Sequence, residues 1–144
     1  MLDKHRKVFI FRFDLHVNSE VELHKVSELF QKVKRSCIQT YGSSFHYFWV
    51  REQAIATMPH YHVVLFMNGS VVQRSLIIQG WIKKHWDQHG YAHWAGVHNV
   101  ERKHQKTIDK ASEHISYLAK NRSKEKNPPA SHNFGHSRFL KSKK

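Results

Sequence analysis

The chain has 144 residues and a formal net charge of +13, from 24 Lys and Arg against 11 Asp and Glu. This length predicts a single domain with a hydrophobic core. The charge excess suits a polyanionic partner, most commonly nucleic acid, although alone it leaves an acidic protein or a membrane surface open. No apolar stretch approaches the roughly 20 residues of a membrane-spanning helix, and we expect no secretory signal at the N-terminus. Cys37 is the only cysteine, which excludes an internal disulfide and favours an intracellular setting.

The first half of the chain predicts a strand, a helix and two further strands. Residues 7–17 are rich in β-formers and alternate along most of their length, as in a half-buried strand. Apolar side chains then recur every three or four residues, which is typical of one helical face, and Gly42 suits the end of that helix. Residues 45–53 and 60–67 read as strands, and the turn pair Asn68-Gly69 ends the second of them.

The second half predicts a helix, a strand and a last helix. The helix spans roughly residues 71–89, and residues 92–100 form a fourth strand. Thr107 is a candidate cap for the last helix, which carries an apolar stripe of its own. From Asn121 onward, Lys, Arg, Ser and a pair of prolines predict a basic, loosely ordered tail.

The order of these elements, β-α-β-β-α-β-α, predicts an α+β fold. Two split βαβ units around a hairpin give a ferredoxin-like or RRM-like antiparallel sheet with helices on one face. In that layout the first and third strands are central, and the last helix lies over the opposite, otherwise open face. We expect one domain over residues 1–121 and a basic C-terminal tail over residues 122–144.

Glu52, His60 and His62 are candidate metal ligands. Side chains two residues apart in a strand share a face, so His60 and His62 can reach one ion. Glu52 belongs to the preceding strand, and a one-residue slip in pairing would turn it away. Two imidazoles and a carboxylate suit Mn²⁺, Co²⁺ or Zn²⁺, and Mg²⁺ less well. The competing interpretation is two strand histidines with ordinary hydrogen bonds and a solvated glutamate.

Tyr117 and Lys120 lie one turn apart on the predicted last helix and on the same side of it. A phenol is a poor nucleophile at its ordinary pKa of about 10. A neighbouring ammonium group or metal favours the phenolate and stabilises charge on a phosphate. The competing interpretation is a partly exposed tyrosine beside a solvated lysine.

Combined, these motifs resemble the HUH endonuclease superfamily: a Glu, then His-x-His in a strand hairpin, then Tyr-x-x-Lys on a later helix. The similarity is to the single-tyrosine rolling-circle replication initiators of small circular-DNA viruses, phages and plasmids. Residues 48–52 and 60–62 also resemble the replication proteins of filamentous phages and integrated satellite elements. Residues 12–16 resemble the first-strand motif of that group, and the resemblance covers roughly residues 7–121.

The resemblance implies a function and a set of roles. It implies that Glu52, His60 and His62 hold a divalent metal, Mn²⁺ or Mg²⁺, and that Tyr117 attacks the scissile phosphate of single-stranded DNA while Lys120 assists. The expected activity is that of a DNA endonuclease and strand transferase with a 5′-phosphotyrosine intermediate, acting on single-stranded DNA at an origin that can include a hairpin. It further implies a host helicase and polymerase as partners, and the cytoplasm of a bacterial host cell. A two-tyrosine mechanism and a helicase domain in this chain are not expected.

Basic and aromatic side chains elsewhere are candidate DNA contacts. The candidate phosphate contacts are Arg102, Lys103, Lys106, Arg122, Lys124 and Lys126. The candidate base-stacking side chains are Trp49, Tyr61, Tyr91, Trp94 and Phe134. Core packing competes as an explanation for the aromatic residues, and a solvated basic face competes for the cations. Asp14 and His16 either join the metal site or contact DNA.

Two other functions stay open from the sequence. A single-tyrosine transposase of the same superfamily is similarly short but works as a dimer, and the oligomeric state is not predictable here. A non-enzymatic single-stranded nucleic-acid-binding module on the same fold would bind without metal dependence and form no covalent product.

Overall fold

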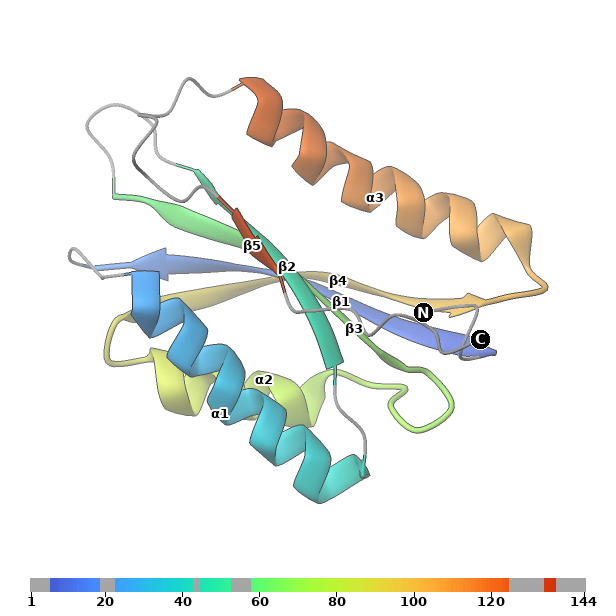
Figure 1. Ribbon diagram of the computed structural model, residues 1–144, viewed down its shortest axis with the longest axis horizontal. Helices are drawn as coiled ribbons and strands as arrows, with labels where there is room; N and C mark the ends of the chain where they lie inside the picture. Colours follow the sequence, from blue (N-terminus) through green and yellow to red (C-terminus); the bar gives the residue numbers. More distant parts are fainter. Residues whose placement is uncertain (1–5, 19–22, 43–44, 53–57, 125–133, 137–144) are drawn as a thin grey trace, which may run out of the picture.

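The computed structural model describes residues 6–18, 23–42, 45–52, 58–124 and 134–136. Helices and strands alternate much as the periodicity predicts. In chain order they are β1 (Lys7–Val17), α1 (Leu23–Tyr41), β2 (Phe45–Glu52), β3 (His60–Asn68), α2 (Leu76–Trp86), β4 (Gly90–Glu101), α3 (Gln105–Lys124) and β5 (Phe134–His136). The strands form one antiparallel sheet in the order β4-β1-β3-β2-β5 (Figure 1). The predicted α+β fold, with its first and third strands central, is therefore confirmed.

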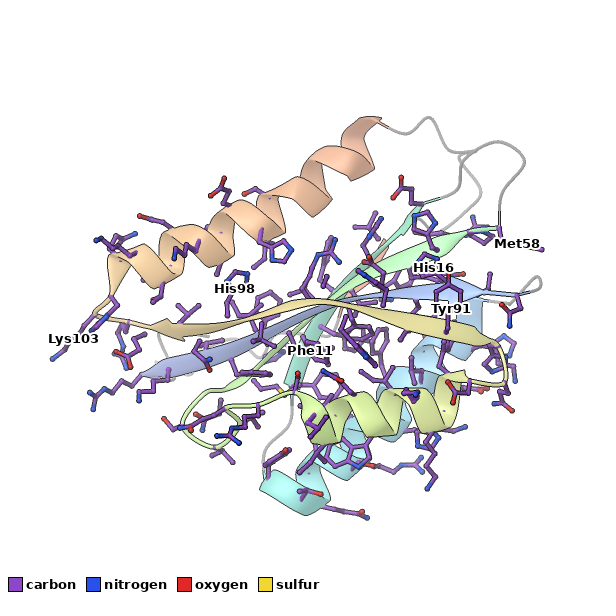
Figure 2. All side chains as sticks on the ribbon, turned by 180° about the vertical axis from the view of Figure 1, so that it is seen from behind. Phe11, His16, Met58, Tyr91, His98 and Lys103 are labelled. Atoms are coloured by element: carbon purple, nitrogen blue, oxygen red, sulfur yellow. The ribbon has the colours of Figure 1, made fainter. Side chains whose placement is uncertain are left out.

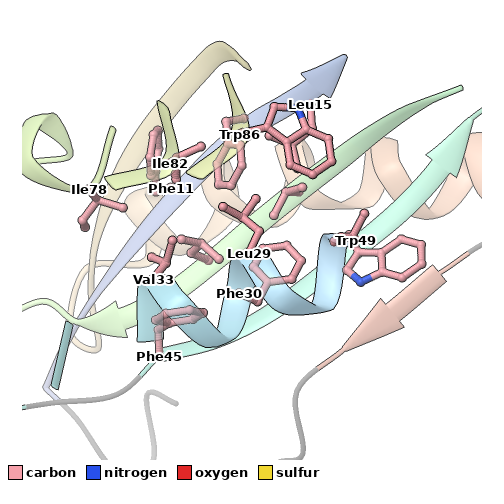
Figure 3. Packing of buried hydrophobic residues seen from close by; sticks show 14 of the residues in the cluster. Phe11, Leu15, Leu29, Phe30, Val33, Phe45, Trp49, Ile78, Ile82 and Trp86 are labelled. Carbon is pink, nitrogen blue, oxygen red and sulfur yellow. The ribbon is translucent and has the colours of Figure 1, made fainter. Parts of the chain in front are cut away.

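The two faces of the sheet are covered differently, with α1 and α2 on one face and α3 on the other (Figure 1). The main core lies beneath α1 and α2, where Phe11 and Leu15 of β1 meet Phe30 of α1 and Ile82 of α2 (Figure 3). Each such fully buried side chain contributes about 1.5 to 3 kcal/mol to folding. The indole of Trp86 also donates a hydrogen bond to the His16 carbonyl at 3.1 Å, which holds the end of β1 on α2.

The face beneath α3 has a smaller apolar core. Val8 and Ile10 of β1, Val64 of β3 and Val100 of β4 pack there against Ala111 of α3. This cluster lies under the first half of α3, so the helix is anchored at one end of the sheet. Polar side chains occupy most of the remainder of the same face, where Val50 of β2 is also buried.

A β-bulge divides β4. The register against β1 shifts between Arg12 and Phe13, so Arg12 pairs with Gly96 while Phe13 pairs with Trp94 and Ala95 is extra. Gly96 has φ +142°, a value that side-chain-bearing residues rarely adopt. The extra residue changes which positions of β4 point towards α3, so the side chains on that face do not follow one alternating pattern along the whole strand.

Local contacts explain where α2 and α3 differ from the sequence prediction. The backbone N–H groups of Val71 and Val72 bond the Asn68 carbonyl at 3.1 and 3.0 Å, so a turn occupies this segment and α2 begins only at Leu76. Helix α3 begins at Gln105, which places Thr107 inside the first turn. Its hydroxyl donates to the His104 carbonyl at 2.7 Å and is not an N-cap.

The C-terminal region contains more structure than the sequence predicts. Helix α3 continues through Lys124, and Phe134–His136 form β5, which pairs with residues 48–50 of β2. Residues 125–133 and 137–144, which include Lys126, lie outside the described part of the chain. The division into a domain over residues 1–121 and a tail over 122–144 stays a prediction.

Candidate metal centre and nucleic-acid interface

One row of side chains crosses four strands on the α3 face. The register places Glu52 of β2 opposite His60 of β3, His60 opposite His16 of β1, and His16 opposite Tyr91 of β4. Because directly opposite residues in a sheet share a face, all four side chains lie on the same side. The register of β2 against β3 therefore keeps Glu52 on the side of the histidines, as the metal-site hypothesis requires.

A second row runs directly beside the first. His62 of β3 is opposite Asp14 of β1, and Asp14 is opposite His93 of β4. His62 is 9% exposed, which is rare for a histidine without a satisfied set of partners. The candidate ligands therefore lie on the central strand β3 and on its neighbour β2, and rigid sheet geometry positions them.

Glu52, His60 and His62 converge on one point. Their ligand atoms, one from each residue, all lie within 4.8 Å of one another. Oε2 of Glu52 lies 3.2 Å from Nε2 of His60 and also contacts Nε2 of His62. An ion bound at about 2.1 Å from each ligand atom separates those atoms by about 3 to 3.5 Å. The group can therefore hold one metal ion.

The hydrogen bonds of His62 indicate which of its ring nitrogens is available to a metal cation. Nδ1 of His62 donates to Oδ1 of Asp14 at 2.8 Å, so the network assigns the proton to Nδ1. The Nε2 lone pair then faces the Glu52 carboxylate, and two electron-rich atoms in contact require a proton or a metal cation between them. Carboxylate–imidazole–metal chains of this kind orient the ligating ring in known metal sites. The residues present fit a divalent ion.

Arg12 and Asp14 form the support beneath His62. Nη1 of Arg12 donates to Oδ1 of Asp14 at 2.5 Å, and Arg12 is only 5% exposed. Burial raises the pKa of Asp14, but the hydrogen bonds from His62 and Arg12 outweigh it and hold the pKa well below its usual range. Asp14 is therefore ionised and bonded to both His62 and Arg12, so it supports the candidate ligand His62.

The pKa values of the Glu52 carboxylate and the His62 imidazole, which contact each other, shift in opposite directions. Burial raises the pKa of Glu52, yet the hydrogen bond to His62 outweighs it and the pKa is lowered. Burial lowers the pKa of His62, but its bonds to Asp14 and Glu52 outweigh it and the pKa is raised. The pair thus favours a positive charge between carboxylates, which is the environment that a divalent cation also requires.

A pair of histidines joins α3 to β4. Nε2 of His98 and Nδ1 of His114 are 2.8 Å apart, so one ring donates and the other accepts. Burial, followed by Lys110 of α3, lowers the pKa of His98. Burial and then Arg12 and His98 lower the pKa of His114, and Asp14 only partly opposes them. The contact therefore favours neutral imidazoles.

Helix α3, whose sequence includes Tyr117 and Lys120, covers the sheet face that holds the ligands (Figure 1). The helix runs from the end of the sheet at Glu101 towards the end where β3 begins. Tyr117 lies one turn, about 5 Å, beyond His114 on the same side of the helix. The backbone of residues 117–124 is described but their side chains are not, so the roles of Tyr117 and Lys120 stay predictions.

The candidate phosphate contacts separate into two groups. Arg102, Lys103 and Lys106 are exposed around the turn from β4 to α3. Figure 2 places Lys103 at the opposite end of the molecule from Tyr91, about 30 Å away along β4. Arg122 and Lys124 belong to the last turns of α3, towards the other end.

The structure sorts the candidate stacking residues. Trp49 and Tyr61 are buried in the main core beneath α1 and α2, and Trp94 packs against that core. Tyr91 is 55% exposed on the α3 face. The side chain of Phe134 lies outside the described residues. Sequence reasoning missed the support of His62 by Arg12 and Asp14, although three polar residues at alternate positions of an apolar strand were its visible signal.

Comparison with known families gives this site a context. The family model that describes the ORF2 type of replication-associated protein matches residues 13–126, which is most of the chain. The chain belongs to this family. The matched region of the replication-associated protein includes all three candidate ligands and nearly the whole of α3. Membership ties it to DNA replication and to nucleic acid.

Two further findings complete the comparison. No curated protein and no solved structure matches the replication-associated protein. Among its described residues, no helix is both long and apolar enough to cross a membrane.

Proposed function

We propose that this replication-associated protein is a HUH-type endonuclease that nicks and rejoins single-stranded DNA to initiate rolling-circle replication. The observation that carries the proposal is the convergence of Glu52, His60 and His62 on the sheet face that α3 covers. A binding module would not need three ligand atoms within 4.8 Å of one another on a shared face. The same helix includes Tyr117, the proposed nucleophile.

The proposed reaction is a transesterification. The phenol oxygen of Tyr117 bonds to the scissile phosphorus while the bond from phosphorus to the 3′-oxygen breaks. The phenol loses its proton and the departing 3′-oxygen gains one, so the products are a 5′-phosphotyrosine and a free 3′-hydroxyl. A divalent ion on the three ligands would polarise a non-bridging phosphate oxygen. The ammonium of Lys120 stabilises negative charge on the phenolate and the phosphate.

Supporting residues hold this arrangement in place. Asp14 fixes the ring orientation of His62, and Arg12 fixes Asp14. The His98–His114 contact and the apolar cluster under the first half of α3 anchor the helix that carries Tyr117. Rejoining is the reverse reaction, because the phosphotyrosine retains the energy of the broken phosphodiester bond.

The test uses a random-sequence pool of single-stranded DNA labelled at the 3′ end, since the protein takes the 5′-phosphate of the downstream fragment. With Mn²⁺, the wild type forms a labelled protein band that survives denaturing gel electrophoresis. Tyr117→Phe removes one oxygen and keeps the shape, so it binds DNA but forms no such band. Lys120→Ala forms it more slowly. Tyr41→Phe makes the same change on α1, at the opposite face of the sheet, and is the matched control that retains the band.

Two results would overturn the proposal. If Tyr117→Phe still forms the covalent band, another residue is the nucleophile. If the wild type binds the pool but forms no band with any divalent ion, the protein is a binding module. His60→Ala separates the two activities further, because it removes a ligand while leaving the basic surface, and it is expected to abolish cleavage with DNA binding largely intact.

A further inference from the structure

Three aromatic rings form a continuous stack on the α3 face, outward from a candidate ligand. His16 stacks on His60 with ring centroids 5.3 Å apart and planes inclined by 19°. Tyr91 stacks on His16 at 4.6 Å with planes only 5° apart. The strand register produces this arrangement, because the three residues lie directly opposite one another on β3, β1 and β4. Figure 2 shows His16 and Tyr91 side by side.

The outer end of this stack is open to solvent. Strand β4 is the edge of the sheet, so no further strand lies beyond Tyr91 among the described residues. Tyr91 is 55% exposed, and His16 is the only ring in the described part of the chain against which it stacks. A large aromatic side chain usually gains stability by burying both faces. Here one face is packed and the other is available for a flat ligand.

We propose that Tyr91 is a stacking platform for an unpaired nucleobase of the DNA strand. Bases stack on aromatic side chains without regard to sequence, because every base has a π-face. The position suits such a base, since Tyr91 lies two strand spacings, about 10 Å, from His60 on the same face. A base seated on Tyr91 belongs to a nucleotide close to the scissile phosphate. The inference rests on the proposed function, because it takes single-stranded DNA as the ligand.

Physical considerations favour a nucleobase over other flat ligands. The chain carries a net charge of +13, which attracts a polyanion to the protein. Of the candidate stacking residues whose side chains are described, Trp49 and Tyr61 are buried in the core on the opposite face. Tyr91 is the one that combines exposure with a place on the ligand-bearing face.

The experiment measures DNA affinity in EDTA, so that binding is separated from cleavage. Fluorescence anisotropy of a labelled oligothymidylate is recorded for the wild type, Tyr91→Ala and Tyr91→Phe. Loss of a stacked base typically weakens binding by about 5- to 150-fold, and this is expected for Tyr91→Ala. Tyr91→Phe retains the ring and stays within about twofold of the wild type. Val97→Ala is the matched control, because Val97 is exposed on β4 but lies opposite Phe11 on the other face.

A single abasic site moved along the oligonucleotide distinguishes stacking from general damage to the surface. At one position, the abasic site weakens wild-type binding but causes no further loss in Tyr91→Ala. Equal losses in both proteins at every position would overturn the stacking platform, as would unchanged affinity of Tyr91→Ala. If the wild type itself fails to bind the oligonucleotide, the proposed function fails as well.

Discussion

Replacing Asp14 by asparagine tests whether the residue behind His62 controls metal binding. Asparagine keeps the size and an acceptor oxygen, so the hydrogen bond from Nδ1 of His62, now 2.8 Å long, can persist. The substitution removes the negative charge that makes the imidazole a stronger ligand. We therefore expect the protein to fold and to bind Mn²⁺ more weakly.

The magnitude follows from the geometry. The hydrogen bond, the imidazole ring and a metal–nitrogen bond of about 2.1 Å place the Asp14 charge about 7 Å from the ion. At an effective dielectric constant of about 20, a unit charge and a divalent ion at that distance interact by about 5 kcal/mol. Partial exposure of Asp14 makes this an upper limit. Loss of such supporting partners typically costs about 10- to 100-fold in metal affinity, or about 1.4 to 2.7 kcal/mol.

Isothermal titration calorimetry with Mn²⁺ measures this effect directly. Asp109→Asn is the matched control, because it makes the same charge change at an exposed position on α3. Imidazole ¹⁵N chemical shifts of the metal-free proteins report which nitrogen of His62 carries the proton. If Asp14→Asn binds Mn²⁺ within about twofold of the wild type, Asp14 does not tune the ligand and the reasoning fails.

Two further outcomes concern charge. Affinity for single-stranded DNA should fall steeply as the salt concentration rises. If Lys103 contacts a phosphate, Lys103→Gln should reduce the magnitude of the slope of log affinity against log salt concentration by about 0.7. An unchanged slope would show that Lys103 is not part of the interface. The lowered pKa values of His98 and His114 mean that the unfolded state binds protons more readily, so the unfolding free energy should fall as pH drops below about 6.5. In urea titrations with EDTA, His114→Gln should reduce this pH dependence, and an identical dependence in both proteins would contradict the assignment.

Periodicity was sufficient to predict most of the elements and both sheet faces. The alternation in residues 7–17 predicts β1 to the residue, and Gly42, at φ +67°, ends α1 near where the sequence placed it. The local pattern carries this information because each face repeats every second residue in a strand or every turn in a helix. Strand β5 was missed because three residues make no period, and only pairing with β2 defines them.

The support of the candidate site depends on pairing between distant strands. The alternating polar residues of β1 mark Asp14 as a candidate site residue, but they do not indicate that its partner is His62, which is 48 positions away. The sequence left the face of Glu52 undecided, because it depends on the register of the β2–β3 hairpin. Residue types therefore indicate which side chains could be ligands, whereas the strand register determines which of these side chains lie close together.

Because β4 contains an extra residue, odd-numbered residues face α3 in one half of the strand and even-numbered residues face it in the other half. Before the bulge, odd-numbered Tyr91 and His93 face α3; after it, even-numbered His98 and Val100 do. Removing Ala95 would restore strict alternation, and one half of the strand would then turn its side chains to the wrong side of the sheet. A single inserted residue thus lets both halves of β4 face α3: the half that anchors the helix and the half that borders the metal ligands.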